Sequence, residues 1–412
     1  MKDFFLKVLF PLKKKERYHL IIILLLTIIV TIFELLGIGL IIPILNIFVG
    51  NEFTKYTQHF NFLNDLPKEN ILIVLLILLG LSYFLKFFIS RHLIYKQNEI
   101  SHKLNTDMSR ALFKKYLYKK YIFHIKNHSS KLIRNTQSEV NIFTFGVVFN
   151  LIRLFCEILI FISICIALLF YEFEASILMI FLFSFVGYFL LKFTNDKLKK
   201  WGLVRQVHSS LLLKQLQHGF ASIKEIIMNN LEEIFINKYH HEILQNAKAG
   251  RNRDTITQLP RLILELIGVS SFIILIIFFL KKGGEVSEVF VIVGVFFFAA
   301  SKLLPSVSKI VQSIQNIKFN SHAVDLIYNE LTDLDKGSNR DSEIKKSENF
   351  NFENILFKNV DFSYSLSDKK ILHNVNLKIN KRDKVGIIGK TGSGKSTFIN
   401  LFCGLLDNNQ GE

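Results

Sequence analysis

Proline, cysteine and tryptophan are scarce in this sequence. Its 412 residues include 5 prolines, 3 cysteines and 1 tryptophan. So few prolines favour long helices over a loop-rich β fold. The cysteines (Cys156, Cys165 and Cys403) show no metal-ligand spacing, and an odd number gives no disulfide framework. We therefore exclude a cysteine-based metal site and a disulfide-stapled domain, and we interpret the three cysteines as packing residues.

Apolar residues, in contrast, are abundant. They make up 50% of the chain, the mean hydropathy is +0.33, and 41 residues are phenylalanine. An ordinary soluble protein is less apolar than this. Six segments reach the roughly 20 apolar residues that cross a bilayer. They lie near 19–49, 70–95, 142–170, 176–197, 256–280 and 286–312. The predicted fold class is therefore mainly α, with six transmembrane helices.

Positive charge alternates between the segments that connect these spans. The N-terminal tail (1–17) carries six Lys or Arg, and the long loops 97–141 and 197–255 carry nine and ten. The opposite loops carry only four between them: 51–69, 171–176 and 281–288. Because basic loops stay in the cytoplasm, we expect a multi-pass inner-membrane protein whose N-terminus is cytoplasmic. The net charge of +17 reflects this topology rather than nucleic-acid binding, because no nucleic-acid-binding motif accompanies it.

The two long cytoplasmic loops show helical periodicity. Leu104, Met108 and Leu112 recur in the first, and Leu212 and Leu216 recur in the second. We therefore expect the spans to continue inward as helical hairpins.

The chain changes character after the last span. We predict a membrane domain over 1–330 and a linker over 331–350, because the stretch from Thr332 to Asn349 is polar. Residues 351–412 open a soluble α/β domain. Three short apolar patterns in it predict strands, at Leu356–Phe362, Val375–Ile379 and Val385–Ile388.

A phosphate-binding pattern follows the last of these strands. Residues Gly389 to Ser396 read G-x-x-x-x-G-K-S and precede a helical pattern, which is the context that confirms a P-loop. Its glycines let backbone N–H groups close around phosphates, and the helix N-terminus adds a favourable dipole. Lys395 can reach the β and γ phosphates, and the hydroxyl of Ser396 can ligate Mg²⁺. The predicted ATP-binding residues here are Gly389, Lys390, Thr391, Gly392, Ser393, Gly394, Lys395, Ser396 and Thr397.

Together these features resemble an ABC exporter half-transporter. The resemblance covers the whole chain: six spans, long cytoplasmic loops, the run Asp361-Phe362-Ser363-Tyr364, and the P-loop. Position alone leaves Tyr364 open between an adenine-stacking ring and a turn aromatic, but the resemblance implies that it stacks on adenine. It also implies ATP and Mg²⁺ as cofactors and a homodimer. The loop tips near Tyr121 to Ser130 and Gly219 to Glu225 would be coupling helices that touch the nucleotide-binding domains.

A narrower resemblance points to one group of exporters. The segments Phe33 to Pro43, Pro260 to Glu265 and Ser301 to Ser306 are similar to bacterial lipid-linked oligosaccharide flippases. The segment Asn51 to Leu66 sits where those flippases carry a short external helix. The chain departs from the family because it holds no glutamine loop, LSGGQ-like signature, Walker B acid with catalytic glutamate, or switch histidine. We therefore assign no catalytic residue, and we expect a fragment or a truncated product.

Several ionisable residues fall within the predicted spans, where each costs at least about 2.5–3.5 kcal/mol unless it faces a cavity or a partner. Lys302 and Lys309 are seven residues apart and share a helical face. A basic strip could hold an anionic headgroup such as a diphosphate, and an arginine belt is thought to do so in the flippases. The candidate headgroup residues are Lys86, Arg261, Lys302 and Lys309.

An alternative is that these cations mark cytoplasmic helix ends or pair with acids of the spans. The available acids are Glu34, Glu157 and Glu265. We favour this alternative for Arg91 and Arg153 and leave it open for the four headgroup candidates.

The expected function is ATP-driven export or flipping of an amphipathic lipid, a lipid-linked saccharide in the most specific form. Rival functions are a lipid A or multidrug exporter, a peptide exporter, and a truncated membrane protein without catalysis. Only 18 residues precede the first span, which argues against the peptide exporters that carry an N-terminal peptidase domain.

Overall fold

We analysed a computed structural model of the chain. It describes residues 2–11, 14–49, 67–281, 286–336, 353–364 and 370–412. The segment Asn51 to Leu66, for which an external helix was expected, lies outside the described residues. The described residues fall into two compact units, Met1–Ser109 with Gln137–Tyr328 and Arg110–Thr136 with Asn329–Glu412. We call them the membrane unit and the nucleotide unit.

Within the described part of the chain, six long helical stretches are apolar enough to cross a membrane, as predicted. They run over Tyr18–Val49, Lys68–Leu117, Ser129–Tyr171, Phe173–Ala221, Glu232–Lys281 and Val286–Phe319. The helices are α2 (Lys14–Val49), α4 (Lys68–Leu117), α7 (Phe149–Tyr171), α8 (Phe173–Ala221), α10 (Glu232–Lys281) and α11 (Val286–Phe319). The third stretch begins with α6 (Ser129–Arg134) and two π-helical segments, Asn135–Glu139 and Ile142–Val148. Four of the six exceed the bilayer requirement by twenty residues or more.

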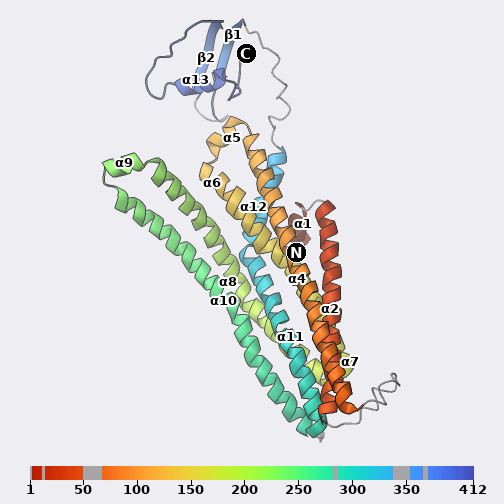
Figure 1. The fold of residues 1–412 in the computed structure, drawn as a ribbon. Helices are drawn as coiled ribbons and strands as arrows, with labels where there is room; N and C mark the ends of the chain where they lie inside the picture. The colour runs from red at the N-terminus through yellow and green to blue at the C-terminus, as the bar shows by residue number, and fades with distance from the viewer. Residues whose placement is uncertain (1, 12–13, 50–66, 282–285, 337–352, 365–369) are drawn as a thin grey trace. The chain divides into compact units, whose positions relative to one another are not determined.

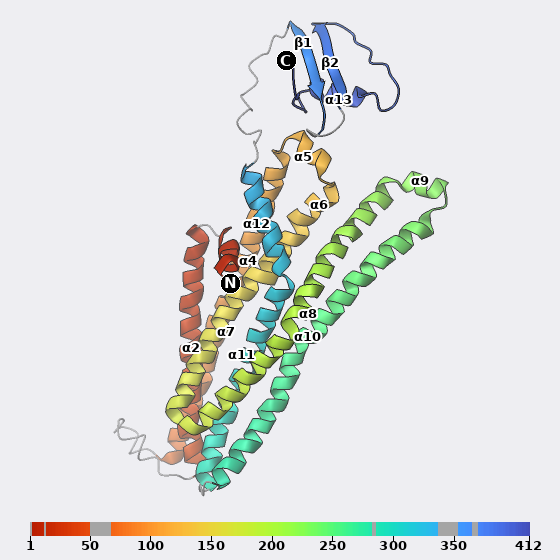
Figure 2. The same cartoon turned by 180° about the vertical axis from the view of Figure 1, so that it is seen from behind.

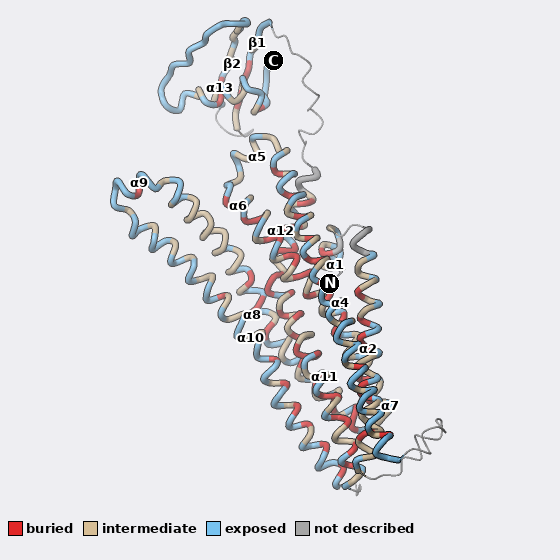
Figure 3. Tube along the Cα trace, viewed as in Figure 1, coloured by how far each residue is buried: buried red, intermediate tan, exposed pale blue. Residues whose placement is uncertain are grey.

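Helix α11 forms the centre of the membrane unit. It contacts α2, α7, α8 and α10, and its inner face supplies fully buried side chains such as Val295, Phe296 and Ala299. The core cluster also takes in Phe183 of α8 and Leu264 of α10. Figure 3 shows the buried segments, in red, along these packed helices. Small residues in α11 let the neighbouring helices approach closely, as is usual between membrane helices.

Helices α8 and α10 run side by side as a long hairpin with α9 (Ile223–Met228) at its tip (Figures 1 and 2). This confirms the helical hairpin that was expected in the second long loop. The ends of α8 and α10 that adjoin α9 are exposed or half-buried. The tip carries exposed apolar side chains, among them Phe220 (74% exposed) and Met228 (71%).

Two short helices were not anticipated as such. Helix α1 (Lys2–Leu9) precedes the first span. Helix α12 (Ser321–Lys336) continues from α11 and includes Thr332 to Lys336, which were predicted to belong to the linker. That part of the linker prediction is wrong. The hydrophobic pattern of α12 is strongly one-sided, so burial of its apolar face keeps the polar stretch helical. The remainder of the predicted linker, up to residue 350, lies outside the described residues.

The nucleotide unit holds a two-stranded antiparallel sheet. Strand β1 (Asn354–Phe362) pairs with β2 (Leu372–Asn380), and the register runs from Asn354 opposite Asn380 to Phe362 opposite Leu372. These two strands confirm the first two strand predictions. Helix α13 (Lys395–Phe402) follows the phosphate-binding pattern.

The predicted strand Val385–Ile388 does not form in the described structure. These residues are extended without ladder partners, and Ile388 is 99% exposed. A continuous apolar run of this kind is typical of a strand that is covered on both faces. No other described segment of the nucleotide unit offers it a neighbouring strand, so the local pattern alone cannot make it one.

Candidate functional site

The phosphate-binding loop joins residue 389 to helix α13. Gly392 and Gly394 have φ angles of +85° and +89°, a conformation that side chains other than glycine's rarely adopt. A Cβ at Gly389 would lie 2.8 Å from the Ser393 hydroxyl, so the loop is also too tight for a larger residue there. Gly394 caps α13 and accepts a hydrogen bond from the Phe398 N–H at 2.8 Å. The loop therefore places the helix N-terminus beside a turn of accessible backbone.

Lys395 and Ser396 occupy the first turn of α13. The Lys395 ammonium donates hydrogen bonds to the carbonyls of Gly389 (2.6 Å) and Lys390 (2.8 Å), so it bends back over the loop. Ser396 is exposed. Backbone N–H groups, a lysine held only by neutral carbonyls, and a free hydroxyl are what a Mg²⁺–nucleotide triphosphate requires. The residues present therefore fit ATP, with Lys395 toward the phosphates and Ser396 toward the metal ion.

The structure brings Tyr364 to the same site. Its hydroxyl lies 3.3 Å from the hydroxyl of Thr397 on α13, although 33 residues separate them. The ring packs edge-on against Phe362 with 5.1 Å between centroids. Tyr364 thus lies beside the N-terminal turn of α13. The geometry agrees with a place in the nucleotide site, and stacking on adenine stays a prediction.

The tip of the first long loop, within Arg110–Thr136, belongs to the nucleotide unit. Helix α5 (Tyr121–Lys126) lies at this tip, and Ile122 packs against a small apolar cluster formed by Phe362, Leu372 and Leu406. Lys120 donates a 2.7 Å hydrogen bond to the carboxylate of Asp407. The cluster joins β1 and β2 to the segment after α13. A movement of the phosphate-binding region can therefore pass directly to this loop tip.

Most of the cations predicted to line the membrane region already have carboxylate partners. Lys86 forms a short ion pair with Glu34. Lys309 pairs with Glu157 at 2.7 Å, and Arg261 pairs with Glu265 at 2.9 Å, one turn along the same helix. For three of the four headgroup candidates, the structure therefore shows the pairing with acids that the sequence left open as an alternative. Arg91 and Arg153 were expected to mark cytoplasmic helix ends or to pair with the same acids. Among the described residues neither arginine has a carboxylate partner, so only the first alternative stays open for them.

Lys302 differs from the other three candidates. Its ammonium lies 4.8 Å from the ring centroid of Tyr83 and 5.5 Å from that of Phe298. The described residues give it no carboxylate partner. Lys86 lies over the Tyr83 ring as well, at 5.0 Å. Tyr83 thus connects two lysines from different helices, and cation–π attraction holds both.

Tyr83 was missed by the sequence reasoning, because an aromatic residue in an apolar span is most often a packing residue. Its hydroxyl is buried, and neither this hydroxyl nor the second carboxylate oxygen of Glu34 has a hydrogen-bond partner among the described residues. The ring packs closely against Gly37, since a Cβ at that position would lie 3.1 Å from it and would require the ring to shift. The unpaired polar atoms mark this cluster, which we call the Tyr83 cluster (Glu34, Tyr83, Lys86, Phe298 and Lys302), as a place where a polar ligand could bind.

Two protein families and several known transporters match parts of this chain. The family "ABC transporter transmembrane region" matches residues 20–301, and the family "ABC transporter" matches residues 372–412. An ATP-dependent lipid A-core flippase of Pasteurella multocida is 21% identical over 343 residues, which cover 83% of this chain and 57% of the relative. The subtilin transport ATP-binding protein SpaT of Bacillus subtilis is 27% identical over 202 residues, which cover 48% and 31%. The alpha-hemolysin translocation protein HlyB of Escherichia coli is 55% identical over 47 residues, which cover 11% and 7%.

The chain spans little more than half the length of the longest of these matches. Its membrane family nevertheless covers well over half of its own residues, and the second family begins at the strand that leads to the phosphate loop. Six candidate spans followed by a P-loop therefore occur in the order of the two matching families. The chain belongs to the ABC transporter family.

Proposed function

We propose that the protein exports or flips an amphipathic lipid, most specifically a lipid-linked saccharide, across the bacterial inner membrane, driven by ATP and Mg²⁺. The N-terminus and the nucleotide unit lie in the cytoplasm in this proposal, because the tail and both long loops carry the basic residues. Translocation uses alternating access: nucleotide binding brings two nucleotide units together, and the loop tips pass that movement to the spans.

The Tyr83 cluster is the observation that carries the lipid assignment. An anionic headgroup needs an uncompensated cation and hydrogen-bond donors at membrane depth. Lys302 supplies the cation, and the buried Tyr83 hydroxyl supplies a donor without a partner. The headgroup contacts the other three candidates only where it displaces the carboxylates that pair with them. These candidates are Lys86, Lys309 and Arg261. A diphosphate carries enough charge to compete with a carboxylate, whereas a neutral drug does not.

A homodimer is part of the proposal. The described residues contain one set of six candidate spans, the sequence contains one P-loop, and ABC nucleotide sites form between two such domains. The exposed apolar side chains at the tip of α8 and α10, Phe220 and Met228 among them, support a partner there. They lie beyond the apolar parts of the helices, where lipid would not cover them, so a second copy is the partner they favour.

Flipping of a diphosphate-linked lipid by the full-length gene product in proteoliposomes tests this proposal, with basal ATP hydrolysis measured in the same preparation. Lys302→Gln should reduce flipping and leave basal hydrolysis unchanged. Lys192→Gln, an exposed lysine on α8 outside the cluster, is the matched control. Unchanged flipping in Lys302→Gln would refute the headgroup role.

Peptide export is the second candidate, because the subtilin transporter is among the relatives. A peptide substrate would stimulate hydrolysis in place of the lipid, and Lys302→Gln would have no effect on that stimulation. A truncated, non-catalytic membrane protein is the rival of another class. It predicts that ATP binding to the purified chain is weak and does not change with Lys395→Ala.

A further inference from the structure

The charged groups of the Tyr83 cluster are two lysines and one glutamate. Glu34 of α2 pairs with Lys86 of α4, and Lys302 of α11 lies over the same tyrosine ring as Lys86. With Glu34 ionised, two ammoniums and one carboxylate give the cluster a net charge of +1. A headgroup with one negative charge would neutralise the cluster. A diphosphate diester carries two negative charges and would leave one in excess.

An excess charge is unfavourable at the depth of this cluster. Glu34 lies near the middle of the span Tyr18–Val49, and Lys302 lies near the middle of Val286–Phe319. The side chains of Glu34 and Lys86 are only 12% and 16% exposed. A buried carboxylate that loses its counter-ion takes up a proton rather than stay charged. The second charge of a diphosphate and the charge of Glu34 therefore exclude each other.

The Glu34 carboxylate has an oxygen that can receive a proton. Lys86 donates to its Oε1, whereas its Oε2 has no hydrogen-bond partner among the described residues. A proton added to Oε2 therefore breaks no hydrogen bond that the structure shows. The buried hydroxyl oxygen of Tyr83, which also lacks a partner among these residues, supplies an acceptor in the same cluster. The neutral acid thus fits where the carboxylate now lies.

The other charged groups of the helices around α2 do not balance Glu34. Helices α7 and α11 pack against α2. Glu157 of α7 and Lys309 of α11 pair with each other at 2.7 Å and so carry no net charge together. Arg153 of α7 and Arg91 of α4 have no carboxylate partner among the described residues, so neither pairs with Glu34. Within the described membrane unit, a proton is the remaining means of neutralising Glu34 once a ligand takes its lysine.

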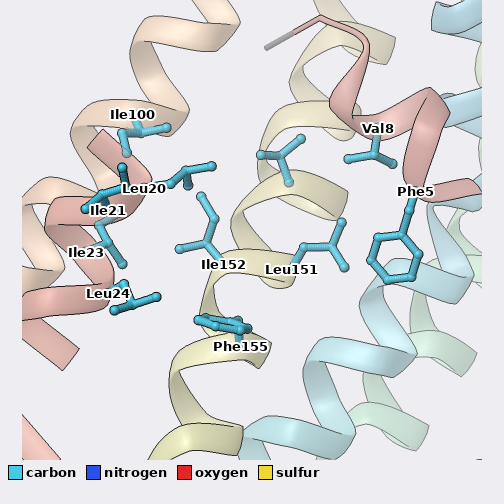
Figure 4. Close-up of a pocket in the computed structure, with 11 residues that line it drawn as sticks. Phe5, Val8, Leu20, Ile21, Ile23, Leu24, Ile100, Leu151, Ile152 and Phe155 are labelled. Carbon is cyan, nitrogen blue, oxygen red and sulfur yellow. The ribbon is translucent and has the colours of Figure 1, made fainter. Parts of the chain in front are cut away.

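An apolar cavity near the start of α2 offers the headgroup no alternative. It has a volume of about 340 Å³ and is lined by residues of α1, α2, α4 and α7. Figure 4 shows its lining side chains, such as Leu24, Ile152 and Phe155, none of which carries a nitrogen or an oxygen. A diphosphate there would lose its hydration and gain no hydrogen bond. Of these two places along α2, only the Tyr83 cluster suits the charged headgroup.

We propose that the headgroup of a diphosphate-linked lipid and one proton bind together at the Tyr83 cluster, with the proton on Glu34. The proposal rests on the proposed function, which supplies the diphosphate-linked lipid. The two phosphates take over the attraction of Lys86 and Lys302, and the Glu34 carboxylate takes one proton from the aqueous phase. Two ammoniums then face two phosphate charges. When the headgroup leaves, Glu34 returns the proton to water and pairs with Lys86 again.

Equilibrium binding to the full-length protein in detergent tests this coupling. The probes are farnesyl-diphosphoryl-N-acetylglucosamine and farnesyl-phosphoryl-N-acetylglucosamine, two diesters with no proton to lose near neutral pH. From about pH 6 to about pH 8, the Kd of the diphosphate probe should rise with pH by up to about tenfold per unit, the limit for one proton. The Kd of the phosphate probe, which matches the net charge of the cluster, should stay constant.

The outcomes separate this proposal from the proposed function. Binding of the diphosphate probe with a Kd that does not change with pH would overturn the proton and leave the proposed function standing. Failure of the diphosphate probe to bind at any pH would count against the proposed function and overturn both.

Proton uptake can also be counted in the unchanged protein. A pH indicator in weakly buffered solution reports the protons that each probe takes up at saturation. We expect close to one proton for each bound diphosphate probe and none for the phosphate probe. Equal uptake with the two probes would overturn the proposal. This measurement decides the question even where a variant of Glu34 fails to fold.

Three variants assign the proton to its residue. Glu34→Gln mimics the neutral acid, so at about pH 8 it should bind the diphosphate probe about tenfold more tightly than the unchanged protein, without pH dependence. Glu34→Asp keeps an ionisable group and should keep the pH dependence. Glu157→Gln removes another paired carboxylate of the membrane unit and should also keep it. Persistence of the pH dependence in Glu34→Gln, or its loss in Glu157→Gln alone, would overturn the assignment to Glu34.

Discussion

The lysines of the phosphate loop and of the membrane region are held in two different ways. Lys395 is held by two backbone carbonyls, which are neutral. Lys86 and Lys309 are held by carboxylates, which cancel their charge. A lysine held by neutral acceptors keeps its full attraction for an anionic ligand. A lysine that is paired with a carboxylate loses this attraction for an anionic ligand unless the ligand breaks the pair.

Lys302 belongs with Lys395 by this criterion, although it lies in a span. Its neighbours Tyr83 and Phe298 offer π faces, which hold a cation without cancelling its charge. The comparison therefore divides the basic residues of the chain into those that can receive an anion and those that stabilise the packing. The expected effects of substitution follow this division.

The largest effect is expected for Lys395→Ala. The substitution removes charge-assisted hydrogen bonds to two phosphates, together about 3 kcal/mol, and so weakens ATP binding about 100-fold. Equilibrium binding of a fluorescent ATP analogue to the purified chain measures it. Lys384→Ala is the control, because Lys384 is an exposed lysine of the same unit that lies outside the phosphate loop. Equal losses in the two variants would show that the loop, and not the Lys395 ammonium, had been damaged.

Lys302→Gln should have the next largest effect. The loss of one charge-assisted contact with a headgroup lowers flipping of a diphosphate-linked lipid about tenfold. Lys302→Arg should retain most of the activity, because it keeps the charge and stacks on aromatic faces. Initial flipping rates in proteoliposomes measure both. If Lys302→Gln flipped normally and Lys309→Gln did not, the division between free and paired lysines would be wrong.

Lys309→Gln should affect stability rather than binding. Glu157 is only 11% exposed, so removal of its partner leaves a desolvated carboxylate in the membrane unit. Lys309 is 42% exposed, so we expect a loss of about 1–2 kcal/mol, less than for a fully buried pair. Thermal unfolding in detergent measures it. The double variant Glu157→Gln/Lys309→Gln should recover most of the loss, and additive losses would contradict a direct pairing.

The tip of the first long loop tests the same division in the nucleotide unit. Lys120 and Asp407 form an exposed pair, so Lys120→Ala should change stability by less than about 0.5 kcal/mol. Ile122→Ser should cost about 1 kcal/mol, because Ile122 packs against the cluster of Phe362, Leu372 and Leu406. Ile125→Ser, at an exposed position of the same helix, is the matched control. If Lys120→Ala lowered the free energy of unfolding more than Ile122→Ser did, the ion pair would contribute more than the apolar contact, and the prediction would be wrong.

The phosphate loop could be predicted from the sequence because its parts are contiguous. Gly389 to Ser396 bring their own turn, their own glycines and the first residues of the helix, so local chemistry decides the geometry. The six spans were predicted for a similar reason, since length and hydropathy are local quantities. The strand Val385–Ile388 was wrong because a strand needs a neighbour, and a neighbour is not a local property.

The membrane site was only partly predicted. The sequence shows which cations and acids fall within the spans. Which of them pair depends on contacts between residues far apart, such as Lys309 with Glu157 and Lys86 with Glu34. Tyr83 lacked any distinguishing signal, because spans are rich in aromatic residues. Helix α1 could have been found, since Phe4, Phe5 and Val8 alternate with charged residues at helical spacing.

The smallest effect is expected for the pair of Lys370 and Asp361, which belongs to the nucleotide unit. It tests whether a lysine paired with a carboxylate stabilises the fold. The hydrogen bond from Lys370 (2.7 Å), followed by that from the Asn374 backbone N–H (2.8 Å), lowers the pKa of the Asp361 carboxyl. A lowered pKa means that the ionised form stabilises the folded sheet. That contribution is complete above the ordinary value of 3.8 and is lost as the pH falls through the lowered folded value.

Asn374 has a φ angle of +44°, so the Asp361 carboxylate also holds a strained residue of β2, where its pairing with β1 is irregular. Amide hydrogen exchange at Asn374, measured from neutral pH to below pH 3.8, should therefore speed up at the acid end relative to an amide in the middle of the strand. Asp361→Asn should show the faster exchange already at neutral pH and no further acid response. An unchanged profile in Asp361→Asn would mean that Lys370 and Asp361 contribute nothing beyond the solvated ions, as most exposed pairs do.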